Sequence, residues 1–102
     1  MTKEYVVAKT SDIAPGTAKQ VEVDGEPIAI FNVNGEFFAI SDTCSHAQAS
    51  LSEGAVEDFV VTCPWHGARF DIKTGKNLCM PAVTPVQKFD LKIEGDAITI
   101  VM

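Results

Sequence analysis

Two short runs of the sequence each pair a cysteine with a histidine. Cys44-Ser45-His46 and Cys63-Pro64-Trp65-His66 are separated by residues 47 to 62. Each run supplies one thiolate and one imidazole, so two loops that approach from opposite sides would offer paired sulfurs to one metal and paired nitrogens to another. A [2Fe-2S] cluster with two Cys on one iron and two His on the other has this ligand set. The spacing therefore predicts an electron carrier.

Zinc is the rival metal, because a tetrahedral zinc site also accepts two thiolates and two imidazoles. Structural zinc sites usually space their cysteines as C-x2–4-C, and finger-type sites follow with H-x3–5-H. In this chain Cys and His alternate as C-x-H and C-x-x-H. That alternation favours the iron–sulfur cluster and leaves a zinc-bound structural or interaction module as the alternative.

The match to one family extends past these four residues. The matching segments are Cys44-Ser45-His46, Leu51-Ser52-Glu53-Gly54, Cys63-Pro64-Trp65-His66-Gly67, Phe70-Asp71, Thr74-Gly75, and Pro81-Ala82 with Pro85. Together they resemble the small Rieske ferredoxins that serve bacterial ring-hydroxylating (aromatic) dioxygenases, over nearly the whole chain. The resemblance implies one Rieske-type [2Fe-2S] cluster per chain. Cys44 and Cys63 would bind the inner iron, and His46 and His66 the outer iron.

The same resemblance implies the function. The chain would carry single electrons from a flavin-dependent NAD(P)H ferredoxin reductase to a terminal Rieske non-haem iron oxygenase in aromatic hydrocarbon catabolism. It would be no enzyme itself, because a mononuclear iron site needs two His and a carboxylate, and the cluster uses both His of the chain. The alternative within electron transfer is a subunit resident in another complex, such as the small subunit of an assimilatory nitrite reductase.

Length, charge and cysteine count restrict the remaining possibilities. A chain of 102 residues is about one domain. Eight basic and fourteen acidic side chains give 8 − 14 = −6, which argues against nucleic-acid or anionic-membrane binding. No apolar run approaches the ~20 residues that span a bilayer. With two cysteines taken as ligands, Cys79 has no intramolecular partner, which fits a reducing compartment. We expect a soluble, cytoplasmic monomer.

The rest of the chain has the pattern of short strands separated by turns. Asp24-Gly25 and Asn34-Gly35 predict hairpin turns, and strands are expected at 5–8, 18–23, 27–33, 36–40, 59–62, 68–72, 87–93 and 97–101. At most one short helical turn is expected, near residues 47–52. We predict an all-β chain whose base is a small antiparallel β-sandwich or partly open barrel. The resemblance makes residues 1–102 one Rieske domain, with a cluster-binding subdomain of about residues 42–84 inserted.

Residues outside the ligand set have narrower expectations. Trp65 is expected to shield the cluster, Pro81 resembles the proline loop that covers the cluster in relatives, and Cys79 is expected to be a small buried hydrophobe. High-potential relatives carry Ser and Tyr hydroxyls at the positions of Ala68 and Phe70, so a low potential is expected here.

Three acids lie between the two metal loops. Two roles stay open for Glu53, Glu57 and Asp58: they rim the face on which a basic partner docks, or they are exposed acids that only keep the protein soluble.

Overall fold

The computed structural model describes residues 3–43, 50–64, 68–78 and 85–101. Within these ranges there is no α-helix. The strands are β1 (Glu4–Lys9), β2 (Thr17–Val23), β3 (Glu26–Val33), β4 (Glu36–Ser41), β5 (Ala55–Glu57), β6 (Val60–Thr62), β7 (Arg69–Asp71), β8 (Lys88–Glu94) and β9 (Ala97–Val101). Two 3₁₀ turns, η1 (Thr10–Asp12) and η2 (Leu51–Glu53), complete the list. None of the described helices is long and apolar enough to cross a membrane.

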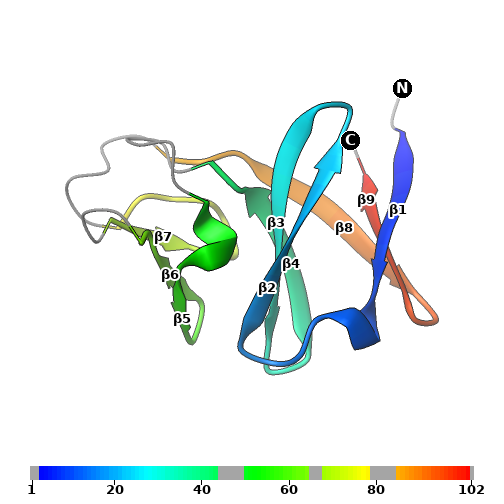
Figure 1. The fold of residues 1–102 in the computed structure, drawn as a ribbon, viewed down its shortest axis with the longest axis horizontal. Helices are drawn as coiled ribbons and strands as arrows, with labels where there is room; N and C mark the ends of the chain where they lie inside the picture. Colours follow the sequence, from blue (N-terminus) through cyan, green and yellow to red (C-terminus); the bar gives the residue numbers. More distant parts are fainter. Residues whose placement is uncertain (1–2, 44–49, 65–67, 79–84, 102) are drawn as a thin grey trace.

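Six strands form one antiparallel sheet in the order β1-β9-β8-β4-β3-β2 (Figure 1). Its hairpins have the turns that the sequence predicts. Val33 pairs with Glu36 across a two-residue loop, in which Asn34 and Gly35 have φ values of 54° and 91°. Both values are positive, as a type I′ turn requires. This turn sets the register of β3 against β4, and β4 ends shortly before Cys44, the first of the predicted ligands.

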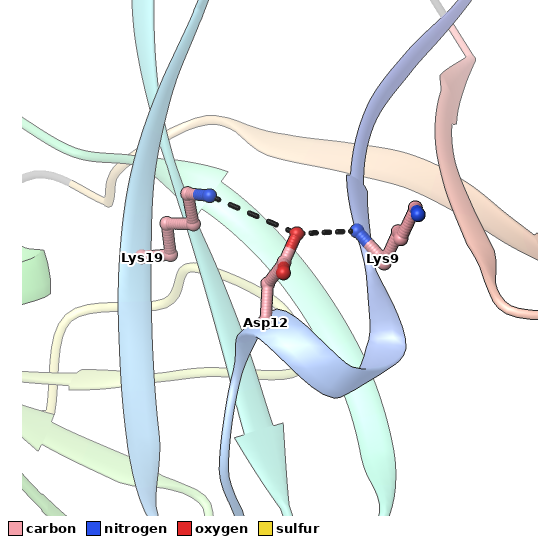
Figure 2. Close-up of polar contacts among 3 residues, drawn as sticks. All are labelled: Lys9, Asp12 and Lys19. Atoms are coloured by element: carbon pink, nitrogen blue, oxygen red, sulfur yellow. Dashed lines mark hydrogen bonds and ion pairs between the residues drawn. The ribbon is translucent and has the colours of Figure 1, made fainter.

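The two edges of this sheet, β1 and β2, approach each other. Tyr5 on β1 donates its hydroxyl to Asp24 Oδ2 at 2.8 Å, and this bond raises the pKa of Tyr5. Figure 2 shows a second tie, in which Asp12 Oδ2 accepts from the Lys9 backbone N–H at 3.0 Å and lies 3.9 Å from Lys19 Nζ on β2. The sheet is therefore a partly open barrel, which confirms the predicted base.

β3 is buried on both of its faces. Ile28 and Ile30 point into the barrel, where they pack with Ile98 and Ile100 of β9. The alternate residues of β3, among them Phe31, belong to a second core on the outside of the barrel. A strand buried on both faces has a continuous apolar run, and Ile28-Ala29-Ile30-Phe31 is such a run. The barrel wall thus carries a second core on its outer side.

A smaller antiparallel sheet of β5, β6 and β7 covers that second core (Figure 1). The sequence predicts β6 and β7 but not β5, which is only three residues long. Asp58, with φ of 53°, turns the chain from β5 into β6. η2 overlaps the end of the segment where the sequence predicts a helical turn; residues 47–49 lie outside the described part of the chain.

Candidate metal centre

Of the four predicted ligands, the structure describes Cys63. It directly follows β6, and its side chain is buried, with 2% of the residue exposed. Cys44, His46 and His66 lie outside the described residues, as do Trp65, Cys79 and Pro81. The geometry of the site is therefore built from Cys63 and from the residues at which the chain enters and leaves the three segments 44–49, 65–67 and 79–84.

The ends of the first segment are held side by side. Thr43 and Ser50, which directly flank residues 44–49, form an antiparallel bridge. One step farther out, the Leu51 N–H donates to the Asp42 carbonyl at 2.6 Å. The Ser41 N–H donates to the Gln87 carbonyl at 2.8 Å, so the entry strand is also tied to the chain after the third segment.

The ends of the second segment are also held side by side. The Cys63 N–H donates to the Ala68 carbonyl at 2.6 Å. The neighbouring residues Thr62 and Arg69 are partners in the β6–β7 ladder. The chain therefore enters residues 64–67 at Cys63 and returns at Ala68, directly beside it.

The third segment returns to the same region. The Val86 N–H donates to the Gly75 carbonyl at 2.8 Å, and the Gly75 N–H donates to the Asp71 carbonyl at 2.7 Å. Asp71 is the last residue of β7. The exit from residues 79–84 is thus fixed to the strand that leaves the second loop.

One core joins these attachment points. Leu51 follows the first segment, Cys63 and Ala68 flank the second, and Val86 follows the third; all four are buried in the same cluster, together with Phe70. Core side chains at native packing density hold their neighbours in defined positions. The core on the outside of the barrel therefore anchors described residues beside all three segments.

The residues present fit a mixed cluster. A Rieske-type [2Fe-2S] centre takes two thiolates on one iron and two imidazoles on the other. Cys63 is one such thiol, and it is buried at the end of β6. Cys44 and His46 fall within the first segment, and His66 within the second.

The acids between the loops lie on the surface. Glu53, Glu57 and Asp58 are exposed, and none of them makes an ion pair in the described part of the chain. Glu57 and Asp58 line a hollow beside the small sheet, and Arg69 lines the same hollow. Sequence reasoning missed Arg69, because its place beside these acids depends on the pairing of β6 with β7.

Known proteins match this chain over most of its length. Residues 3–90 match the family described as the Rieske [2Fe-2S] domain. The chain is 47% identical over 94 residues to the ferredoxin component of biphenyl 2,3-dioxygenase from Rhodococcus jostii (strain RHA1), covering 92% of this chain and 88% of that protein.

Two solved structures are similar in sequence and fold. The ferredoxin of carbazole 1,9a-dioxygenase from Nocardioides aromaticivorans IC177 has a TM-score of 0.92 and 32% identity over 96% of both chains. The ferredoxin in a complex of reduced oxygenase and oxidized ferredoxin of carbazole 1,9a-dioxygenase has a TM-score of 0.90 and 35% identity, over 95% of this chain and 91% of that one.

These matches confirm the predicted Rieske fold, the Rieske-type [2Fe-2S] cofactor and the electron-carrier role. The relatives are named as ferredoxin components, which also confirms that the chain is an electron-transfer component and not the catalytic one. They do not favour the zinc module or the resident nitrite reductase subunit. The chain belongs to the Rieske [2Fe-2S] domain family and is an electron-carrying ferredoxin.

Proposed function

We propose that this protein carries single electrons from a flavin-dependent NAD(P)H ferredoxin reductase to a terminal Rieske oxygenase of a ring-hydroxylating dioxygenase system. The observation that carries the proposal is the 35% identity, across 95% of this chain, to a ferredoxin solved in complex with an oxygenase. A flavin-dependent reductase suits the donor side, because a flavin accepts the two electrons of a hydride from NAD(P)H and can pass them on one at a time.

The proposed ligands are Cys44 and Cys63 for one iron, and His46 and His66 for the other. When bound, the cluster supplies a site that takes up and releases one electron. The buried position of Cys63, on the core that also fixes the ends of the first segment, supports placing the thiolates on the protein side.

We assign the cluster-binding subdomain to about residues 42–84, on the base formed by the barrel. The small sheet of β5, β6 and β7 lies within that range, and it packs on the outer face of β3. A contact between Phe38 of β4 and Phe59, with ring centroids 5.8 Å apart, also joins the two parts. We place the protein in the cytoplasm, as a monomer.

The docking face is proposed to include the exposed acids Glu53, Glu57 and Asp58. The ion pairs among the described residues, such as that of Lys92 with Glu4 at 2.7 Å, lie on the barrel. The three acids make no such pair in the described residues, so their charge is available to a basic partner. Electrostatic steering of this kind speeds association more than it tightens binding.

Reconstitution tests the proposal. Purified protein is mixed with a flavin-dependent ferredoxin reductase, NADH or NADPH, and the terminal oxygenase of a ring-hydroxylating dioxygenase. Turnover of the aromatic substrate that requires this protein, at sub-stoichiometric amounts, is the expected result. A protein that co-purifies tightly with one large partner and does not exchange between oxygenase molecules contradicts the free carrier.

A further inference from the structure

The carboxylate of Asp42 is buried at the entry to the first metal loop. Asp42 is 1% exposed, and no other acidic side chain in the described part of the chain is buried. It stands two positions before Cys44. Acidic side chains are rarely buried unless hydrogen bonds satisfy them, so the partners of this carboxylate indicate its role.

Four hydrogen bonds join Asp42 to other residues in the described part of the chain. Asp42 Oδ1 accepts from the Ser52 backbone N–H at 2.8 Å, and Oδ2 accepts from Gln20 Nε2 at 2.5 Å. Its own N–H donates to the Pro27 carbonyl at 3.1 Å, and its carbonyl accepts from the Leu51 N–H at 2.6 Å. One residue therefore joins β2, β3 and the 3₁₀ turn that follows the first loop.

We propose that Asp42 is a positioning residue for the first cluster loop. Its carbonyl and its Oδ1 hold Leu51 and Ser52 beside the point where the chain departs toward Cys44. Its Oδ2 fixes the same carboxylate to the barrel through Gln20. The residues on either side of 44–49 are thus bonded to strands of the large sheet as well as to each other. The inference rests on the proposed ligand set, because this segment carries Cys44 and His46.

The variants separate positioning from ordinary stability. Asp42→Ala removes both side-chain acceptors. Asp42→Asn keeps an oxygen for the Ser52 N–H, and Gln20 can rotate its terminal amide to present its oxygen to the new NH₂ group. Asn32→Ala is the matched control, because Asn32 is also buried, at 4% exposure, and also bonds two segments, through the Ile13 carbonyl at 2.8 Å and the Gly35 N–H at 2.8 Å.

The control site is well separated from the loop. Ile28 pairs with Ser41, the residue before Asp42, in the β3–β4 register. Asn32 lies four residues farther along β3, which places it about 13 Å from Ile28 at ~3.3 Å per residue. Asn32→Ala should lower the thermal midpoint without reaching the cluster loop.

Three measurements are made on the cluster-loaded proteins: the rate of cluster loss to a chelator, the EPR spectrum after one-electron reduction, and hydrogen–deuterium exchange of the peptide covering residues 50–54. Asp42→Ala should speed both cluster loss and exchange at least ~10-fold, since the Ser52 N–H loses its acceptor, and should change the EPR line shape. Asp42→Asn should stay within about threefold of wild type. Asn32→Ala should leave all three readouts unchanged.

Wild-type cluster retention in Asp42→Ala, or equally fast loss in Asn32→Ala, overturns the inference. If Asp42→Ala does not fold, Gln20→Met replaces it in the test. Gln20→Met should lose its cluster faster than Asp42→Asn does. Equal rates of cluster loss in Gln20→Met, Asp42→Asn and the wild type overturn the inference. A wild-type protein without a [2Fe-2S] cluster removes the proposed ligand set itself. A wild-type cluster that is indifferent to Asp42→Ala removes only the role of Asp42.

Discussion

A methyl group added at Gly54 would press on the backbone of Thr62, which directly precedes the proposed ligand Cys63. In Gly54→Ala the new Cβ would lie 2.1 Å from the Thr62 carbonyl oxygen, 3.1 Å from the Thr62 carbonyl carbon and 3.2 Å from the Leu51 carbonyl oxygen. Ordinary contacts begin near 3.4 Å, so one side must move by more than about 1 Å. All three atoms belong to the backbone, which cannot rotate away.

Neither side can move alone. The Gly54 N–H donates to the Leu51 carbonyl at 2.9 Å, and Thr62 is paired with Ala55 on one side and Arg69 on the other. A shift of Thr62 passes directly to Cys63, the next residue. We therefore expect Gly54→Ala to cost about 2–3 kcal/mol, the upper part of the range for overpacking. For a domain of this size that cost lowers the thermal midpoint by about 10–20 °C.

Gly95→Ala is the matched control. Gly95 lies in the β8–β9 turn with φ of +63°, and a Cβ there would meet no atom within 4 Å. The left-handed backbone costs an alanine about 1–2 kcal/mol, so this variant is also destabilised, but at a site outside the cluster-binding region.

Iron and sulfide content, the rate of cluster loss and the thermal midpoint are measured for both variants. Gly54→Ala should lose iron or release it faster, whereas Gly95→Ala should keep a normal cluster despite its lower midpoint. A Gly54→Ala protein with wild-type stability and cluster retention would refute the close approach of Gly54 to Thr62. Equal cluster loss in both variants would show that general destabilisation is sufficient.

Three further predictions address the ligands, the docking face and the potential. Replacing any one of the four proposed ligands should abolish the cluster, because each iron needs four ligands, whereas Cys79→Ser should keep it; absorption and EPR spectra of the purified variants decide, and the reverse pattern contradicts the assignment. Electron transfer to the oxygenase should slow as salt is added, since charges such as Glu57 and Asp58 are screened beyond about 8 Å at physiological ionic strength; a flat or rising stopped-flow profile would mean apolar docking. The wild-type midpoint potential should lie near the low end of the Rieske range of about −150 to +300 mV. Ala68→Ser and Phe70→Tyr, both at buried positions, should each raise that potential by some tens of millivolts. A hydrogen bond to a charged group is worth ~1.5–3 kcal/mol, and ~59 mV corresponds to ~1.4 kcal/mol. Voltammetry that finds a wild-type potential well above zero, or variants with normal clusters and unmoved potentials, contradicts the last prediction.

Local signals in the sequence predict most of the strands. Asn34-Gly35 marks its hairpin because few residues adopt the positive φ values of that turn. The sequence predicts a strand at 27–33, but the burial of β3 on both faces is seen only in the structure. β5 escapes prediction because Ala55–Glu57 is too short to show an alternating pattern. The turn at Asp58 needs a positive φ without a glycine to signal it.

The site is predicted less completely than the fold. The spacing of Cys and His indicates the cofactor, because ligand chemistry is local. Asp42 is different: in the sequence it is one more acid beside a turn. Its burial depends on Gln20, twenty-two residues earlier in the chain, and on a 3₁₀ turn that begins after the first loop. Such contacts follow from the sheet order, which no local pattern contains.

Metal and sulfide analysis of the purified protein tests the central claim most directly. A Rieske ferredoxin should contain two iron and two acid-labile sulfide per chain, and it should gain an EPR signal on one-electron reduction, because an odd electron then resides on the iron pair. A colourless protein with one zinc per chain and no sulfide would contradict the account.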